Sequence, residues 1–212
     1  MSSALSGEVP VYPTPWGKRW LDVSVAVLAL AILWPIFILA ALLIKLDSPG
    51  PIIVRQKRVG KGGRLFTFYK FRTLMGGEEA DLRERLPNGD LSQQLLSPPG
   101  SNPRAGSIGR VLRATTVDEL PQLLNVVRGD MSLVGPRPDL PQIVVRWPSY
   151  YHQRHKVKPG MTGLAQVNGR SDITYAQKIR YDLDYVRYHP LRRDLAILLK
   201  TIGLVLSKKG AR

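Results

Sequence analysis

The stretch Val23–Ile44, VSVAVLALAILWPIFILAALLI, decides the fold of this chain, because none of its 22 residues carries a charge. A helix rises ~1.5 Å per residue, so this stretch would be ~33 Å long, about the hydrocarbon thickness of a bilayer. A helix that is apolar on almost every face does not suit a soluble protein. The stretch therefore predicts a helix that enters the membrane.

The middle and the two ends of this helix bear on its topology. Pro35 removes one helical hydrogen bond and clashes with the carbonyl of Ala31, which predicts a kink. Lys18 and Arg19 precede the run and Lys45 follows it, and positive residues prefer the cytoplasmic side of a membrane. A helix that enters, bends near mid-bilayer and returns places both basic ends on one side. The residues leave a straight span and this re-entrant bend both open.

The composition of the 212 residues indicates the class of partner. Thirty-one Lys and Arg against 16 Asp and Glu give a formal charge of +15 and a pI near 10.4. Such a basic balance favours nucleic acid, an acidic lipid surface or a phosphorylated small molecule. The chain has no cysteine, which excludes disulfides, a cysteine zinc site and a thiolate nucleophile. Its three histidines form no recognisable metal motif.

The order of polar and apolar stretches divides the chain into three parts. Residues 1–17, rich in Pro, Ser and Gly, predict a flexible tail, and residues 18–46 are the membrane helix. Residues 47–212 form the remaining domain. Within it, the polar segment of about 76–106 contains four prolines and predicts a mobile loop with a short helix over 78–86.

The remaining patterns predict a mostly helical α+β domain with a small β-hairpin. Two strand-like runs, 52–58 and 64–72, are joined by a glycine-rich hairpin loop. Helices are expected over 119–128, 175–188 and 195–206, and the last is too short to span a membrane. It would lie in the membrane interface or pack in the core. Short strands are expected at 131–134 and 164–167, and a surface amphipathic helix at the membrane interface across 143–151, broken at Pro148.

The second predicted strand offers an alternative function. It combines aromatic and basic side chains, which can stack and hold nucleic-acid bases. The other interpretation, which we favour, is a half-buried strand at a membrane surface. The side chains concerned are Phe66, Phe68, Tyr69, Lys70, Phe71 and Arg72.

Two adjacent carboxylates, Asp118 and Glu119, lie at the apparent start of the helix 119–128. Thr116 with Glu119 fits a capping box, but this places Pro121 where its missing N–H would be felt. With Asp118 as the N-cap, Pro121 loses no intrahelical bond, so we prefer that cap. Either arrangement puts both acids at the positive end of a helix dipole, which favours their ionised forms.

The carboxylate pair has two interpretations. Acids at helix N-termini are common and stabilise the helix, and the residues alone favour this reading. A carboxylate is also a possible nucleophile or metal ligand, and a helix N-terminus favours a phosphate group. Arg113, five residues before Asp118, could neutralise a nearby phosphate. These are the parts that phosphoryl transfer requires.

Several motifs distributed along residues 16–207 have a specific combined spacing. They are Lys18-Arg19 with Asp22; Lys45-Leu46-Asp47-Ser48-Pro49-Gly50-Pro51 with Gln56, Arg58 and Gly60; Lys70-Phe71-Arg72-Thr73; Leu112-Arg113 before Asp118-Glu119-Leu120-Pro121-Gln122; Gly135-Pro136-Arg137-Pro138; Lys158-Pro159-Gly160 through Gly163-Leu164-Ala165-Gln166-Val167; and Asn168-Gly169-Arg170. In these motifs the sequence resembles the bacterial sugar transferase family, and in size it resembles a small monotopic phosphoglycosyl transferase.

The resemblance implies an enzyme on the cytoplasmic face of the bacterial inner membrane. Such enzymes move a phosphosugar from a UDP-sugar to a polyprenyl (undecaprenyl) phosphate and release UMP, as the first membrane step of glycoconjugate assembly. It implies that Asp118 attacks the β-phosphate and becomes a covalent phosphosugar adduct. Glu119, together with Asp118, would hold Mg²⁺.

The resemblance also implies the remaining site residues and the topology. Substrate contacts carried over by motif are Lys70, Arg72, Arg113, Pro136, Arg137, Pro138 and Asp182. The membrane segment becomes a re-entrant helix, although Trp34 stands where members of the family often have Ser before the kinking proline. Anionic lipids are expected partners and nucleic acid is not.

Overall fold

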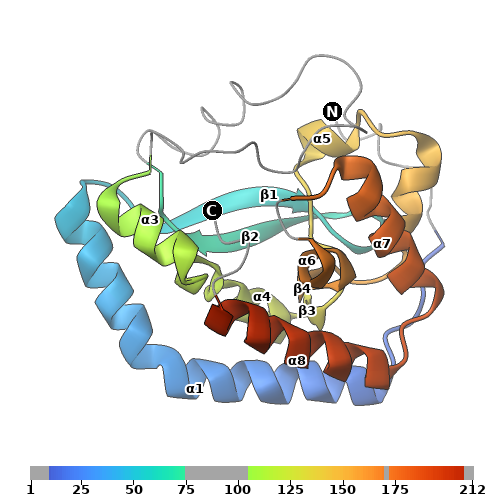
Figure 1. The fold of residues 1–212 in the computed structure, drawn as a ribbon, viewed down its shortest axis with the longest axis horizontal. Helices are drawn as coiled ribbons and strands as arrows, with labels where there is room; N and C mark the ends of the chain where they lie inside the picture. Colours follow the sequence, from blue (N-terminus) through green and yellow to red (C-terminus); the bar gives the residue numbers. More distant parts are fainter. Residues whose placement is uncertain (1–9, 75–104, 170–171, 208–212) are drawn as a thin grey trace.

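The computed structural model describes residues 10–74, 105–169 and 172–207, and it is dominated by the long helix α1, Trp16–Asp47. In the most apolar 18-residue window of α1, 11% of the residues are buried, so α1 is not the core helix of a soluble protein. Figure 1 shows α1 as a bent rod that continues as a helix through Pro35. The predicted apolar helix is confirmed, and it extends beyond the uncharged run at both ends.

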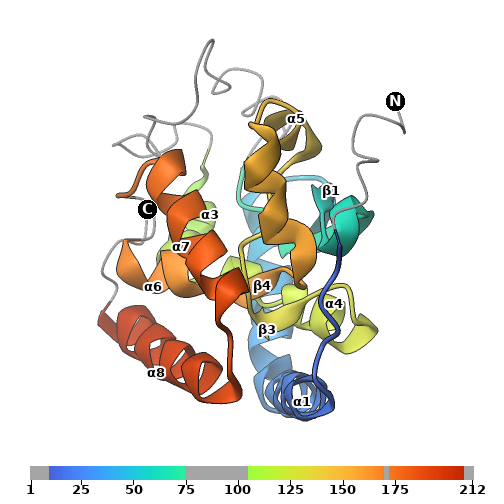
Figure 2. The same cartoon turned by 90° about the vertical axis from the view of Figure 1, so that its right-hand side faces the viewer.

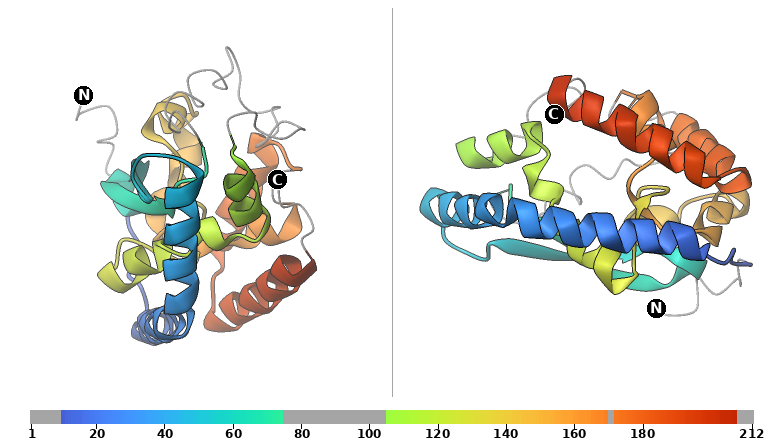
Figure 3. Two further views of the ribbon diagram at one scale, coloured as in Figure 1. Left: turned by 90° about the vertical axis from the view of Figure 1, so that its left-hand side faces the viewer. Right: turned by 90° about the horizontal axis from the view of Figure 1, so that it is seen from below.

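Both ends of α1 are bound to the same folded body. At its start, the guanidinium of Arg19 donates to the carbonyls of Val126 and Val127 at 2.6 and 2.9 Å. Lys18 pairs with Asp194 at 2.6 Å. At the other end, the ring of Phe37 packs edge-on against Phe71, with 5.5 Å between the centroids. The helix therefore lies along the rest of the protein over its whole length (Figure 3).

The predicted hairpin is confirmed to within one residue at each end. Strands β1, Ile53–Val59, and β2, Leu65–Phe71, pair antiparallel across the short 3₁₀ turn η1, Lys61–Gly63. Gly62 and Gly63 have φ of 65° and 76°, which suits glycine in a tight connection. Phe68 and Phe71 are buried. The aromatic strand is thus largely core, which supports the half-buried strand that the sequence favoured.

A second set of elements follows the segment 75–104, which lies outside the described residues together with most of the predicted loop and its short helix. In chain order these elements are α3, Ser107–Ala114; η2, Val117–Glu119; α4, Gln122–Arg128; β3, Ser132–Val134; α5, Pro141–Val144; η3, Ser149–Lys156; β4, Gly160–Thr162; α6, Leu164–Asn168; α7, Tyr175–Arg187; and α8, Leu191–Ser207. The class is mostly helical α+β, as predicted. The expected helix at 175–188 corresponds to α7, whose first turn carries a capping box between Thr174 and Gln177.

The strand predicted at 164–167 is wrong, because those residues form α6. The strand lies just before it, as β4, and pairs in parallel with β3. The backbones of Gly160 and Gly135 approach so closely that a Cβ on Gly160 would stand 2.1 Å from the Gly135 nitrogen. Glycine, rather than the apolar run after it, therefore decides where β4 forms.

The surface amphipathic helix predicted across 143–151 is also wrong. This segment forms α5 and the start of η3, and it buries Val144, Trp147 and Tyr151. An amphipathic pattern shows that one face is apolar, and here that face packs on the protein instead of on lipid.

Helix α8 keeps an exposed apolar row and lies along the same edge of the molecule as α1 (Figures 1 and 2). The exposed residues are Leu191, Leu195, Leu199, Ile202 and Leu206. The helix starts four residues earlier than the predicted 195–206. Of the two placements that the sequence left open, α8 has the features of an interface helix, with Asp194 and Ile197 turned inward.

Candidate active site

The carboxylate pair lies in the 3₁₀ turn η2, between α3 and α4. Thr116 adopts a left-handed conformation, with φ of 61°, and starts this turn. The prediction of a helix capped by Asp118 is wrong, and so is the capping box on Thr116, because neither side chain caps a helix end. The backbone itself satisfies the turn, since the Glu119 N–H donates to Thr116 O at 3.2 Å. The carboxylates of Asp118 and Glu119 are therefore free of capping bonds, and each pairs with a basic side chain.

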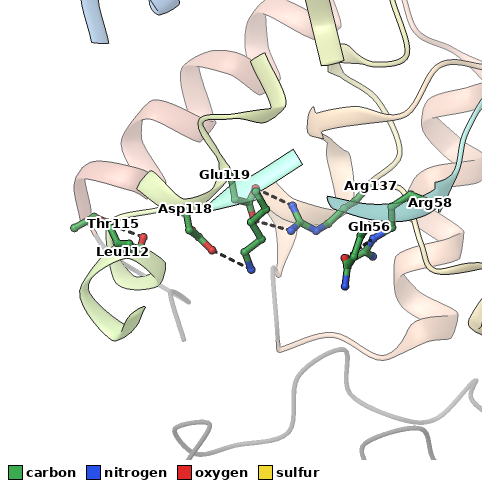
Figure 4. Close-up of polar contacts among 8 residues, drawn as sticks. Gln56, Arg58, Leu112, Thr115, Asp118, Glu119 and Arg137 are labelled. Atoms are coloured by element: carbon green, nitrogen blue, oxygen red, sulfur yellow. Dashed lines mark hydrogen bonds and ion pairs between the residues drawn. The ribbon is translucent and has the colours of Figure 1, made fainter. Parts of the chain in front are cut away.

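Asp118 is 4% exposed and pairs with Lys70 of β2, with 3.1 Å between Oδ2 and Nζ (Figure 4). Burial raises the pKa of Asp118, the charge of Lys70 opposes this rise, and neighbouring Glu119 adds to it. The expectation that a helix dipole would favour the ionised form does not hold for Asp118. Desolvation is the largest influence on the pKa of Asp118, and the charge of Lys70 is the largest influence that opposes it.

Glu119 has a different environment from its neighbour. Its two carboxylate oxygens accept hydrogen bonds from Nη1 and Nη2 of Arg137 at 2.9 and 2.5 Å (Figure 4). Burial raises the pKa of Glu119, but Arg137 and Lys70 outweigh burial and lower this pKa to about 2. Glu119 is therefore ionised at neutral pH, and the paired fork geometry fixes the plane of the guanidinium.

The structure thus brings four of the expected site residues together: Asp118, Glu119, Lys70 and Arg137. Arg113, in the last turn of α3, is close enough to lower the pKa of Asp118. The sequence separates these residues by up to 67 positions, and the hairpin, η2 and the segment after β3 bring them into one place.

Arg72 is directed elsewhere, although it stands two residues from Lys70. Its guanidinium donates to the carbonyls of Ile44, Ser48 and Pro49 at 3.3, 2.6 and 2.8 Å. Arg72 therefore holds the turn at which the chain leaves α1, and not the carboxylate pair.

The two prolines of the Gly-Pro-Arg-Pro motif are buried on either side of Arg137. The carbonyl of Pro136 accepts from the Gly160 N–H at 3.0 Å. The carbonyl of Pro138 accepts from Nη1 of Arg58 at 3.2 Å. Arg58 is itself held by Gln56, whose Oε1 accepts from Nη2 at 2.6 Å. Figure 4 shows Gln56 and Arg58 beyond Arg137, on the side away from Asp118.

Asp182 is linked to the main chain of Arg137 through Arg154, and it does not pair with Asp118 or Glu119. Its carboxylate pairs with Arg154 at 2.6 Å, and Arg154 donates to the main-chain oxygen of Arg137, also at 2.6 Å. The cluster is completed by Asp139 and Lys178, which the sequence analysis missed together with Arg154. A signal did exist for part of it, because Lys178 and Asp182 stand one helical turn apart on the face of α7 that also buries Ile179.

The donor set for a divalent cation is small. Among the described residues, no group of three or more His, Cys, Asp or Glu side chains could hold a metal. Mg²⁺, however, commonly binds one or two carboxylates and completes its shell with substrate phosphates and water. Asp118 and Glu119 fit that pattern, provided that Glu119 shares its oxygens between the cation and Arg137.

Comparisons with known proteins identify the family of this chain. Residues 14–208 match the sequence profile described as bacterial sugar transferase. The chain is 42% identical, over 97% of its length and 75% of the relative, to UDP-glucose:undecaprenyl-phosphate glucose-1-phosphate transferase of Caulobacter vibrioides. It is 38% identical to exopolysaccharide production protein ExoY of Sinorhizobium fredii, over 92% of this chain and 87% of that one.

A third relative is larger. The undecaprenyl-phosphate galactose phosphotransferase of Salmonella typhimurium is 39% identical over 92% of this chain, which spans 41% of that protein.

Proposed function

Because this chain belongs to the bacterial sugar transferase family, we propose that it transfers a sugar phosphate from a UDP-sugar to undecaprenyl phosphate and releases UMP. The relatives carry names of this reaction with glucose, galactose or N-acetylgalactosamine. The observation that carries the proposal is the Asp118–Glu119 pair held between Lys70 and Arg137. The product, undecaprenyl diphosphate sugar, would begin the assembly of a glycoconjugate.

The first step is attack by Asp118 on the β-phosphorus of the UDP-sugar. A carboxylate oxygen forms a new P–O bond, the bond to UMP breaks, and its electron pair leaves with UMP. The sugar phosphate stays on Asp118 as an acyl phosphate. Burial makes this carboxylate more basic, and Lys70 at 3.1 Å keeps the ionised, nucleophilic form accessible.

The second step regenerates the enzyme. A phosphate oxygen of undecaprenyl phosphate attacks the same phosphorus, and the carboxylate of Asp118 leaves. The transferred group passes through two displacements, and no water enters the product. Because the charges of both substrates are phosphate charges, Lys70, Arg113 and Arg137 can stabilise both steps.

Glu119 and Asp118 are the residues that would hold Mg²⁺, which when bound neutralises diphosphate charge. Arg137 now occupies both oxygens of Glu119. Upon substrate binding we expect Arg137 to exchange part of this pair for a phosphate oxygen, since a guanidinium fork fits both groups.

The place of action that we propose is the cytoplasmic face of the bacterial inner membrane, with α1 as a re-entrant helix and anionic lipids beneath α8. The support is that the two ends of α1 contact one folded body, at Arg19 and at the turn held by Arg72. A straight span would separate those ends by a bilayer. The exposed apolar row of α8, along the same edge as α1, suits the interface.

The test of the reaction is UMP release by the purified protein in detergent with undecaprenyl phosphate and a panel of UDP-sugars. We expect release with one sugar well above the others, and the same sugar phosphate on the lipid product. No UMP with any sugar, from protein that is folded and supplied with Mg²⁺, would contradict the proposed activity.

The topology has its own test, because the chain contains no natural cysteine. Single cysteines introduced at Ser6 and at Pro51, on either side of α1, should react with an impermeant thiol reagent from the same side of oriented vesicles. Reaction from opposite sides would show that α1 crosses the membrane.

A further inference from the structure

The segment Arg137-Pro138-Asp139 has no regular secondary structure, yet each of its carbonyl groups has a specific donor. The oxygen of Arg137 accepts from Nη2 of Arg154 at 2.6 Å. The oxygen of Pro138 accepts from Arg58 at 3.2 Å, and that of Asp139 from the Val59 N–H at 3.0 Å. Proline lacks an N–H, so Pro138 could not join a backbone ladder. Two arginine side chains and one main-chain N–H therefore decide where this segment lies.

Arg154 is the most strongly fixed of these donors. It is 2% exposed, and its guanidinium lies 5.0 Å from the ring centre of Trp147. Besides the Arg137 oxygen it contacts two carboxylates, those of Asp139 and Asp182. One guanidinium thus holds the main chain of residue 137 and the side chain of residue 139 together.

The charges around Arg154 balance within the interior. Asp139 also pairs with Lys178, so two carboxylates face two cations in the buried cluster Asp139–Arg154–Lys178–Asp182. A buried ion cluster is weak evidence for stability, because apolar side chains of similar volume often serve as well. This points to a role for the charges other than holding the fold.

We propose that Arg154 is a positioning residue, which sets the place of the Arg137 guanidinium at Glu119 and hence at the phosphates of the nucleotide sugar. The inference rests on the proposed function, because it takes Arg137 as a phosphate contact. In the described part of the chain Arg154 contacts Asp139, Asp182, the ring of Trp147 and the main chain of Arg137, and not the carboxylate pair. It acts on the proposed reaction through the main chain of Arg137, one residue away from the reacting groups.

The planar guanidinium of Arg154 has two terminal nitrogens, which explains why a lysine could not make the same contacts. Nη1 is directed to Asp139, while Nη2 serves both the Arg137 oxygen and Asp182. A lysine keeps the charge and the cluster's balance, but it offers one nitrogen in place of the planar fork. Arg154→Lys therefore removes the positioning contact with the least disturbance of the interior.

The experiment is a double-mutant cycle on UMP release with Arg154→Lys, Arg137→Gln and the double variant. We expect Arg154→Lys to lower kcat/KM by about 10–100-fold, since a displacement near 1 Å can cost that much. In the Arg137→Gln background the same change should cost less than about twofold, because the group it positions is gone. UDP affinity, measured by calorimetry, should show the same pattern and remains measurable in slow variants.

Arg193→Lys is the matched control. Arg193 also holds main-chain carbonyls, those of Asp184 and Tyr188, and pairs with a carboxylate, Asp184. It lies in α8, and we expect its kcat/KM and UDP affinity to stay within twofold of wild type.

Two outcomes would overturn the inference: wild-type kcat/KM in Arg154→Lys while Arg137→Gln is impaired, or equal losses from Arg154→Lys in both backgrounds. The second result would mark Arg154 as structural. Wild-type activity in Arg137→Gln would instead remove Arg137 from the proposed site. Absence of UMP release in every protein, wild type included, would count against the proposed function itself.

Discussion

Two groups of opposite charges lie on the two sides of the Pro-Arg-Pro segment, and they are built differently. In front, Asp118 pairs with Lys70, and Glu119 pairs with Arg137. Behind, the cluster Asp139–Arg154–Lys178–Asp182 is shared among four side chains. In the front group the side chains of Arg137 and Glu119 are 34% and 20% exposed, whereas those of Arg154 and Asp182 are each 1% exposed.

This difference in exposure separates ion pairs that can exchange a partner for a phosphate from ion pairs that keep both partners. A front pair that reaches solvent can give up a partner to a phosphate at small cost, since water and salt screen the change. A buried pair cannot, because the partner left behind would be an uncompensated charge in the interior. The Glu119–Arg137 pair can therefore exchange a partner for a phosphate, whereas the rear group, which is buried like the Asp118–Lys70 pair, suits the placement of Arg137.

The sharpest way to break the front group is Asp118→Asn. Asparagine preserves the size of the side chain but is no nucleophile, so we expect UMP release to fall by at least about 10³-fold. Incubation with the UDP-sugar and no acceptor should add one sugar phosphate to the wild-type mass and none to the variant.

The control for this change is Asp184→Asn, which neutralises an aspartate whose side chain is 57% exposed, near α8. Its turnover should remain at the wild-type level. Undiminished UMP release in Asp118→Asn would remove the nucleophile assignment.

Removal of Mg²⁺ separates the chemistry from the fold. With excess EDTA we expect UMP release to stop and to return on addition of Mg²⁺, because diphosphate charge is no longer neutralised. The melting temperature should not change, since Arg137 and Lys70 already satisfy the two carboxylates. In Glu119→Gln, a higher Mg²⁺ concentration should be needed for half-maximal rate. A fall in the melting temperature with EDTA would mean that the metal is structural.

The stability of the protein should distinguish the two groups directly. Asp139→Asn leaves Arg154 and Lys178 facing Asp182 alone, so the free energy of unfolding should fall by about 3–5 kcal/mol. Glu119→Gln should cost about 1 kcal/mol or less, because its pair is partly exposed. Urea titration in detergent, followed by tryptophan fluorescence, measures both. Equal losses in the two variants would contradict the division into exchangeable and permanent pairs.

The parts of the fold that the sequence predicted correctly depend on local signals. The uncharged run gives α1, the glycines after Val59 give the hairpin turn, and a 3.6-residue period gives α7. The parts that it missed depend on distant contacts. The apolar face at Val144 packs inward, and β4 forms where Gly160 meets Gly135, 25 positions away in the sequence.

The candidate site divides in the same way. Motifs marked Asp118, Glu119 and Arg137, and the structure brings them together with Lys70. No motif indicated that Arg72 would hold the exit turn of α1, since Arg72 and Lys70 occur in one motif. The rear cluster was missed because its charges come from η3, from α7 and from the irregular segment after β3. Their role becomes visible only when the fold buries the four side chains against one another.

The smallest effect should appear in the pH dependence of Lys70→Gln. Burial raises the pKa of Asp118, and the positive charge of Lys70 counteracts this rise. Loss of that charge favours the protonated acid, so the pKa of Asp118 should rise further. In the proposed mechanism only the ionised carboxylate of Asp118 attacks, so the acid limb of the kcat/KM profile should move to higher pH. At neutral pH the loss should be about 10–100-fold, the value of one charged hydrogen bond.

Lys57→Gln provides the comparison, because Lys57 is an exposed lysine of the adjacent strand, with its Nζ 3.1 Å from Thr67 Oγ1. Its pH profile should coincide with that of the wild type. If the acid limb of Lys70→Gln stays in place while kcat/KM falls uniformly at all pH values, Lys70 binds substrate without tuning Asp118. In that case Arg113, whose charge also lowers the pKa of Asp118, would keep the carboxylate ionised, and the front group would contain more charges than its two ion pairs.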